Sequence, residues 1–306
     1  MGRAAASQFI SGPVRPGIRR AGGSAMNATQ RPNVLITGVS TGIGYDAARY
    51  LVERGYRVFG SVRNQADGDR VAQALGSNFT PLMFDVTDTE AIASAARQVE
   101  ASVGDAGLCA LVNNSGVSGA GPLMHYPLAD LRRMFEVNVF GLLAVTQAFL
   151  PLLGARSDRI GPRGRVINIS SISGGLVFPF VGAYGASKHA VEALTDGLRR
   201  ELSIYGIPVI GIEPGNIRTP IWEKSANLDP AYARTDYAPI LAKFPAILAE
   251  MVRKGDPVER VSVAIHEAIT ARRPKTRYPL TFLWRLSRVL GDRALDRLTL
   301  KAMGFE

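Results

Sequence analysis

Short apolar runs alternate with longer amphipathic stretches along most of this chain. The strand-like runs are NVLITG (33–38), RVFGSV (57–62), FTPLMFDV (79–86), LCALVNN (108–114), RVINISS (165–171) and PVIGIEPG (208–215). Helix-like stretches such as YDAARYLVERG and LADLRRMFEVNVFGLLAVTQAFLPLLG lie between them. This alternation predicts βαβ units, and strands that are apolar almost throughout predict a parallel sheet covered on both faces. We therefore expect residues 31–270 to form a single α/β domain with a doubly wound (Rossmann) sheet.

Residues 1–30 differ from this pattern. They are rich in Gly, Ala and Arg, contain no acidic residue and show no apolar period, so we expect a disordered extension. Our preferred interpretation is that translation begins at Met26. A transit peptide in residues 1–25 for an organelle is the alternative, because such peptides are Arg-rich and poor in acids.

Charge is concentrated at the two ends of the chain. The sequence has 36 basic and 26 acidic residues, of which residues 1–30 contribute four Arg and residues 271–306 contribute nine basic residues and three acids. The body between them is neutral, so a nucleic-acid-binding face is not predicted. The single Cys109 cannot form an intramolecular disulfide, and no run of 18 apolar residues suggests a spanning helix. A cytoplasmic protein is expected.

Glycines mark the turn between the first strand and the first helix. The turn reads Thr37-Gly38-Val39-Ser40-Thr41-Gly42-Ile43-Gly44. Glycine lets the backbone turn tightly and approach a pyrophosphate, which the N–H groups at a helix N-terminus stabilise. The turn predicts a dinucleotide site with contacts from Gly38, Ser40, Thr41, Gly42, Ile43 and Gly44. A tight βα turn without a ligand is the alternative.

The end of the second strand indicates which dinucleotide binds. Gly60-Ser61-Val62-Arg63-Asn64 contains a cation, and no acid follows until Asp67. A guanidinium binds a 2′-phosphate, so NADP(H) is favoured over NAD(H), although Arg63 as a solvated surface residue is the alternative and Thr41 supplies no second cation. At the tip of the third strand, Asp85 is predicted to accept a hydrogen bond from the adenine amino group, and Val86 is predicted to contact the cofactor. Asp85 could instead be a turn residue.

Tyr184 and Lys188 predict proton transfer. They lie four residues apart in a helix-prone segment, so both side chains share one face, and an ammonium there would lower the pKa of the phenol. Ser171, which ends a strand 13 residues before Tyr184, could donate to a substrate oxygen. Together they could polarise a carbonyl for hydride addition. His125 and His266 lack acidic or Cys partners at ligand spacing, and His189 points away from the face of Tyr184 and Lys188, so no metal site is expected.

These motifs, taken in order, resemble those of the short-chain dehydrogenase/reductase family over residues 31–270. They are the turn at 38–44, Asp85, NNSG at 113–116, Asn138, Ser171, Tyr184-x-x-x-Lys188 and PGNIRT at 214–219. The resemblance implies a tetrad in which Ser171 polarises the carbonyl, Tyr184 is the acid or base, Lys188 holds the nicotinamide ribose, and Asn138 positions a water that links Lys188 to solvent.

The same resemblance implies further cofactor contacts and an assembly. Thr219, with the backbone near Ile217, would contact the carboxamide, and Asn113 would keep a cofactor role although Ser115 replaces the usual Ala. Helices at 129–153 and from about Ala183 would form a homodimer or homotetramer.

The segments after Ser171 and Pro214 should form the substrate site, beyond the carboxyl ends of the strands. Their apolar and aromatic residues suggest a lipophilic small-molecule substrate, although packing in the core or in an oligomer is the alternative. They are Leu176, Val177, Phe178, Phe180, Ile221, Trp222, Leu228, Tyr232, Tyr237 and Phe244.

The tail, residues 271–306, has helix-spaced apolar residues with basic residues between them. It resembles the end of the retinol- and 17β-hydroxysteroid-dehydrogenase-like branch. We expect a basic helical extension packed over the substrate site; peripheral contact with a membrane is the alternative.

The sequence therefore predicts an NAD(P)-dependent oxidoreductase that interconverts an alcohol and a ketone or aldehyde on a lipophilic substrate. A 3-oxoacyl-thioester reductase is the second hypothesis, which the additional tail weakens. A non-catalytic regulator that senses a dinucleotide is the third.

Overall fold

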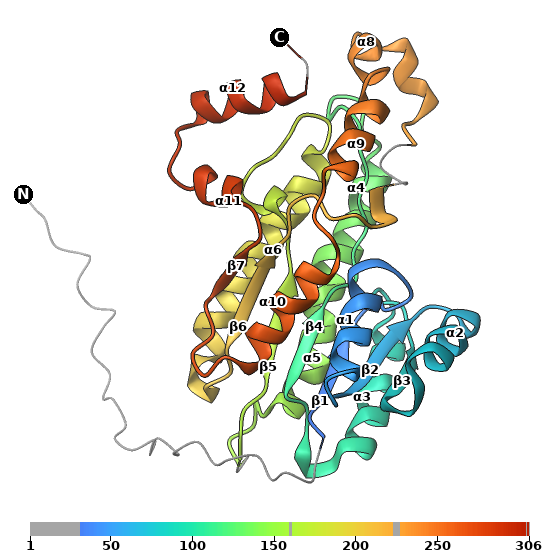
Figure 1. The fold of residues 1–306 in the computed structure, drawn as a ribbon, viewed down its shortest axis with the longest axis vertical. Coiled ribbons are helices and arrows are strands. Elements are labelled where there is room, and N and C mark those ends of the chain that lie inside the picture. Colours follow the sequence, from blue (N-terminus) through green and yellow to red (C-terminus); the bar gives the residue numbers. More distant parts are fainter. Residues whose placement is uncertain (1–30, 159–160, 223–226, 304, 306) are drawn as a thin grey trace, which may run out of the picture.

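Seven parallel strands form one sheet in the order β3-β2-β1-β4-β5-β6-β7 (Figure 1). The computed structural model describes residues 31–158, 161–222, 227–303 and 305, so the predictions for residues 1–30 lie outside the described residues. The strands are β1 (Asn33–Ile36), β2 (Arg57–Val62), β3 (Phe79–Met83), β4 (Ala110–Asn113), β5 (Arg165–Ile169), β6 (Val209–Glu213) and β7 (Arg277–Pro279). The doubly wound fold is confirmed, and the first six strands fall within the predicted runs.

Helices cover both faces of the sheet, as the apolar strands require. Val34 and Ile36 pack on one side, against apolar residues of α1 and α10, and Leu35 packs on the other, against α3 and α5. The helices are α1 (Gly42–Val52), α2 (Gln65–Leu75), α3 (Thr89–Val103), α4 (Leu128–Phe135), α5 (Leu142–Phe149), α6 (Gly182–Glu201), α8 (Ala238–Leu241), α9 (Phe244–Arg253), α10 (Glu259–Thr270), α11 (Phe282–Ser287) and α12 (Asp292–Ala302).

The strand order reverses between β1 and β4, and this reversal places the crevice. Ile36 pairs with Val112, and the Thr37 N–H donates to the Val112 carbonyl at 3.0 Å. The Gly-rich turn after β1 and the loop after β4 therefore leave the sheet side by side. In open α/β sheets a ligand binds at such a switch point, beyond the carboxyl ends of the strands.

Strand β7 corrects one prediction: residues 271–306 were expected to be helical, but Arg277–Pro279 form a strand. Gly211 pairs with Arg277 and Glu213 with Pro279, and the Leu280 N–H donates to the Glu213 carbonyl at 3.0 Å. The strand has three residues and ends in proline, which is tolerated at a sheet edge. So short a run carries no alternation that sequence reasoning could detect.

One helical segment runs from Leu128 to Leu153 and contains a π-helical turn at Glu136–Gly141. By length and composition it could cross a membrane, but half of its most apolar window is buried inside the fold. Core helices pass the same test, so this segment carries no membrane assignment.

Candidate active site

The Gly-rich turn ends in an open helix N-terminus. Gly38 and Gly42 have φ of +69° and +59°, a region that residues with a side chain rarely occupy. Helix α1 begins at Gly42, and the side chain of its N-cap residue, Thr41, accepts no capping hydrogen bond. The first N–H groups of α1 and the positive end of its dipole are therefore available to an anion.

Neighbouring polar groups hold this turn in place. The Gly38 N–H donates to Ser61 Oγ at 2.9 Å, and Asn114 Nδ2 donates to the carbonyls of Thr37 and Gly38 at 2.8 and 3.0 Å. A β-carbon on Gly44 would lie 2.2 Å from the Gly38 carbonyl oxygen. Gly44 thus acts by close packing beneath the turn. Ser61 and Asn114 were not predicted, because a single Ser or Asn at a strand end carries no specific signal.

A cavity of about 520 Å³ extends from this turn across the carboxyl ends of the strands. Most of the predicted site residues line it, namely Gly38, Ser40, Thr41, Gly42, Ile43, Arg63, Asp85, Val86, Ser171, Tyr184, Lys188, Ile217 and Thr219. Gly44, Asn113 and Asn138 do not appear in the lining. An elongated cavity with an open helix N-terminus and cations at its walls fits a dinucleotide.

Tyr184, Lys188 and Ser171 meet at one end of the cavity. Tyr184 and Lys188 lie in α6, one turn apart, with Lys188 Nζ 5.7 Å from the centre of the Tyr184 ring. Lys188 is buried, and its Nζ donates to the Ile169 carbonyl at 2.9 Å. Ser171 follows β5, where its Oγ accepts from the Ser173 N–H at 3.1 Å and its hydroxyl reaches Tyr184.

The expected lowering of the Tyr184 pKa is not seen in this arrangement. Burial raises the pKa of Tyr184 to about 12, and the hydrogen bond with Ser171 opposes that rise. Burial also lowers the pKa of Lys188 to about 8. In both groups desolvation has the largest effect, because burial disfavours the charged form of each. A phenol with so high a pKa stays protonated at neutral pH and can donate its proton.

Asn138 lies in the π-helical turn, a feature that often marks functional sites. Its Oδ1 accepts from the Val117 N–H at 2.8 Å, and its Nδ2 donates to the Val117 carbonyl and to Ser187 Oγ at 2.9 and 3.0 Å. A β-carbon on Gly116 would lie 3.3 Å from Asn138 Oδ1 and 3.8 Å from Lys188 Nζ. Asn138 therefore ties the loop after β4 to α6 beside Lys188.

Asn113 departs from the prediction. Its buried Nδ2 donates to Thr146 Oγ1 and Asn168 Oδ1 at 2.8 and 2.9 Å, and Asn168 Nδ2 donates to Thr195 Oγ1 at 2.9 Å. This network joins β4 and β5 to helices α5 and α6. Residues 114–116 line the cavity instead, because Asn113 is still within the strand and its side chain points into the core.

The opposite end of the cavity carries positive charge. Arg63 lines it, and Arg70 of α2 donates to the Ser40 carbonyl at 2.7 Å while pairing with Asp67 at 2.7 Å. Arg70 is a second cation near this end, and sequence reasoning missed it because it comes from the following helix. Asp85 Oδ1 accepts from the Thr87 N–H at 2.9 Å, so it is also a turn residue, whereas Asp88 caps α3.

The apolar residues predicted for the substrate pocket mostly pack against one another. Ile221 and Trp222 line the cavity. Phe180, Tyr232 and Phe244 are buried in a cluster with Met303 of the tail, and Phe178, Trp222, Leu228 and Tyr237 pack against it. Leu228 and Tyr232 also line a second hollow of about 430 Å³, which shares Val117, Ser118 and Arg133 with the first.

The tail lies over the loop that follows Ser171. Figure 1 shows α11 beside the end of the sheet and α12 beyond it, with the C-terminal end of α12 toward α9. A β-carbon on Gly175 would lie 2.6 Å from the Trp284 ring, and the rings of Phe180 and Phe305 stack at 5.5 Å. Phe180 has φ of +67°, an unusual value for a residue with a side chain. The packing around its ring holds that conformation.

Comparisons with known proteins agree with this geometry. Residues 32–229 match the sequence model of the short chain dehydrogenase family. The chain is 42% identical to an NADPH-dependent 3-dehydrocapnine reductase of Ornithobacterium rhinotracheale, over 87% of this chain and 95% of that protein. It is 37% identical to human retinol dehydrogenase 5, over 80% and 79% of the two chains. A solved short-chain dehydrogenase from Streptomyces avermitilis superposes with a TM-score of 0.71 at 30% identity, covering 89% and 96%.

Proposed function

The chain belongs to the short-chain dehydrogenase/reductase family, and from that premise we propose that it is an NADP-dependent oxidoreductase that interconverts an alcohol and a ketone or aldehyde. The observation that carries the proposal is the cavity itself. Its walls hold the Gly-rich turn at one end and Ser171, Tyr184 and Lys188 at the other. A dinucleotide lying along it would bring its reactive ring to the proton donor.

The cofactor preference rests on charge. Arg63 lines the cavity beyond β2, Arg70 lies beside Ser40, and the acid that follows, Asp67, is already paired with Arg70. The 2′-phosphate on the adenosine ribose of NADP(H) would therefore meet cations and no unpaired carboxylate from the segment after β2. The relative from Ornithobacterium rhinotracheale is named as NADPH-dependent, which supports the same choice. NAD(H) is the weaker alternative.

In the direction of reduction, NADPH would supply the hydride when it is bound. The Ser171 hydroxyl donates a hydrogen bond to the carbonyl oxygen, and the Tyr184 phenol, protonated at neutral pH, gives its proton to that oxygen as negative charge develops. Lys188, fixed by the Ile169 carbonyl, holds the ribose hydroxyls and stabilises the phenolate that remains. Asn138 keeps the loop at Val117 in contact with α6.

We assign a lipophilic substrate to the region around Ile221 and Trp222. The apolar cluster behind Trp222 and the retinol dehydrogenase relative support this choice. The tail packed over the loop after Ser171 would close the site. We also propose a cytoplasmic oligomer built through the helical segment 128–153 and α6. In the π-helical turn of that segment, Phe140 is 54% exposed.

The test is a fluorescence titration with NADPH and with NADH, followed by NADPH consumption with a panel of apolar ketones and aldehydes. Tyr184→Phe should reduce turnover by at least about 100-fold while leaving the Kd for NADPH unchanged, because only the proton donor is lost. Tyr205→Phe, outside the cavity, is the matched control. If neither nucleotide binds, the assignment as an NAD(P)-dependent enzyme is refuted. If Tyr184→Phe keeps the full biological function of the protein, a non-catalytic dinucleotide sensor is favoured.

A further inference from the structure

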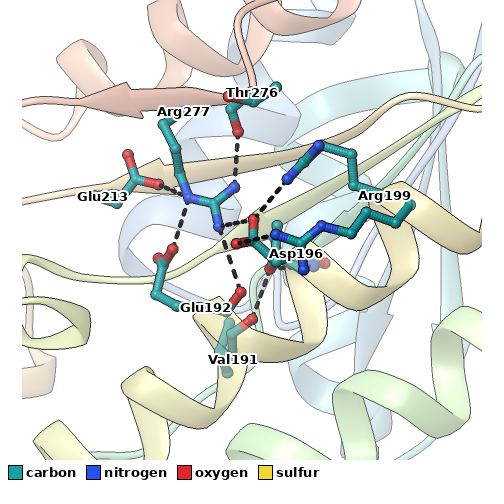
Figure 2. A network of polar contacts seen from close by, with 10 residues as sticks. Val191, Glu192, Asp196, Arg199, Glu213, Thr276 and Arg277 are labelled. Carbon is teal, nitrogen blue, oxygen red and sulfur yellow. Dashed lines mark hydrogen bonds and ion pairs between the residues drawn. The ribbon is translucent and has the colours of Figure 1, made fainter. Parts of the chain in front are cut away.

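A cluster of charged side chains joins α6 to strands β6 and β7 (Figure 2). Arg277 of β7 reaches three acids from two other elements. Its Nε lies 2.7 Å from Glu192 Oε2 and 3.3 Å from Glu213 Oε1, and its Nη2 lies 2.8 Å from Asp196 Oδ1. The guanidinium thus joins β6, β7 and α6. The reaction as described above uses none of these four residues.

The acids of α6 continue the catalytic face of that helix. Tyr184, Lys188, Glu192 and Asp196 are spaced by four residues, so each lies about 6 Å along the axis from the one before. A β-carbon on Gly174 would lie 2.8 Å from Glu192 Cγ and 3.1 Å from the Lys188 carbonyl oxygen. Glu192 therefore packs directly beyond Lys188.

The surroundings of Lys188 give Glu192 its electrostatic importance. From β5 the ammonium meets the Ile169 carbonyl, and it shares the space next to Gly116 with the amide oxygen of Asn138; both groups are uncharged. On its own helix it faces Tyr184 on one side and Glu192 on the other. Burial lowers the pKa of Lys188 to about 8, and the negative charge of Glu192 opposes that fall.

Glu213 allows Glu192 to be the charged member of the pair on Arg277 Nε. Glu213 is fully buried and has the longer contact with the guanidinium. Burial and the repulsion of Glu192 raise the pKa of Glu213 to about 8, against which Arg277 and the N–H groups of Tyr278 and Glu213 act. A carboxyl group with a pKa above neutral carries its proton at neutral pH, so Glu213 is the protonated carboxyl group beside Arg277. Asp196 is balanced by Arg199 and Arg200.

We propose that Glu192 is a positioning residue for the proposed reaction, in which Arg277 fixes its carboxylate so that it keeps the buried Lys188 an ammonium ion. The catalytic importance of Glu192 rests on the proposed function, but its electrostatic effect on Lys188 can be measured without substrate or cofactor. It also joins two parts of the chain. The segment that covers the site supplies Arg277, so its docking on β6 and α6 sets the charge state at the catalytic end.

The decisive measurement is the titration of Lys188 by NMR. The chain has six lysines, so protein grown with lysine labelled with carbon-13 at Cε gives few resonances, and Lys188→Arg assigns the one of interest. In the wild-type protein Lys188 should titrate near pH 8. In Glu192→Gln its acid dissociation constant should rise about tenfold, because an opposite charge one helical turn away is lost.

Asp196→Asn is the matched control. It also removes a partner of Arg277 but lies two turns from Lys188, so the titration should stay in place. Glu192→Asp retains the charge and should restore most of the wild-type titration. If Glu192→Gln does not fold, the double variant Glu192→Gln/Arg277→Met removes both charges of the pair. Its Lys188 titration is then compared with that of Asp196→Asn/Arg277→Met.

The kinetic counterpart is the pH profile of kcat/KM for carbonyl reduction. Lys188 is charged below its pKa, so the alkaline limb should move to lower pH in Glu192→Gln and stay unchanged in Asp196→Asn. An unchanged Lys188 titration in Glu192→Gln overturns the proposal, as does an equal shift in Asp196→Asn, which would show general loosening of the cluster. The titration is measured on the free protein, so it stands whether or not a reductase activity is found.

Discussion

The buried carboxyl group of Glu213 makes a quantitative prediction about stability. Its pKa in the folded protein is about 8, raised from the ordinary 4.5 first by burial and then by Glu192. Between these values the folded protein binds one proton more than the unfolded chain, so the free energy of unfolding falls as pH rises. The difference corresponds to about 5 kcal/mol, nearly all of it lost by pH 8. Such a loss is a large part of the stability of a typical domain.

Glu213→Gln removes this titration while keeping the shape of the protonated acid. Its amide oxygen can still face Arg277 Nε, as Glu213 Oε1 does at 3.3 Å. Urea denaturation followed by circular dichroism should show nearly equal stability of variant and wild type near about pH 5, and the variant ahead by several kcal/mol near about pH 9. The opposing effect of Lys188, whose folded pKa is lowered, is common to both proteins and cancels in the comparison.

The control is Glu201→Gln, an exposed carboxylate at the end of α6, which should change stability little at any pH. A Glu213→Gln protein that is less stable than the wild type at every pH would refute the reasoning. That result would mean that Glu213 is ionised in the fold and that its pairing with Arg277 outweighs its burial.

Two further predictions concern the cofactor end of the cavity. Arg63→Ala should raise the Kd for NADPH by about 10- to 100-fold, the value of one charge-assisted contact, and leave the Kd for NADH unchanged; equal effects in fluorescence titration would contradict the phosphate assignment. Gly44→Ala should lose NADPH binding and have a lower melting temperature, because its β-carbon would lie 2.2 Å from the Gly38 carbonyl oxygen. Gly197→Ala in α6 is the control: a β-carbon has room there, so this variant should be as stable as the wild type or more stable. Equal behaviour of the two variants would argue against close packing at Gly44.

The sequence was sufficient for the parts of the fold that repeat a pattern. Six strands and the helices between them could be predicted because buried parallel strands are apolar throughout and amphipathic helices have a period of their own. The turn at Gly38 and the pair Tyr184 and Lys188 could be located because their spacing has a physical reason. β7 could not be predicted, since a three-residue edge strand exists only through its pairing with β6.

The site residues that were not predicted make contacts across the fold, and no regular spacing in the sequence marks them. Ser61 and Arg70 hold the turn from the next strand and helix, and nothing in their local sequence indicates this. Asn113 does not line the cavity because it is the last residue of β4 and its side chain lies in the core, and the end of that strand cannot be located to one residue from the sequence. The pKa of Tyr184 depends on how deeply the ring is buried, which no spacing reveals.

The origin of Arg277 in the tail has a consequence for how the protein is made. During synthesis the N-terminal part of a chain leaves the ribosome first, and a domain folds as a unit once its parts are available. Every cavity-lining residue named above, and the acids of α6, are made before Arg277. Until that residue emerges, Glu192 and Glu213 lack the guanidinium that joins them, and β6 is an open edge. All residues of the proposed nucleotide site are therefore synthesised before the arginine that joins α6 to the sheet, and β6 gains its second neighbour only when the tail has been made.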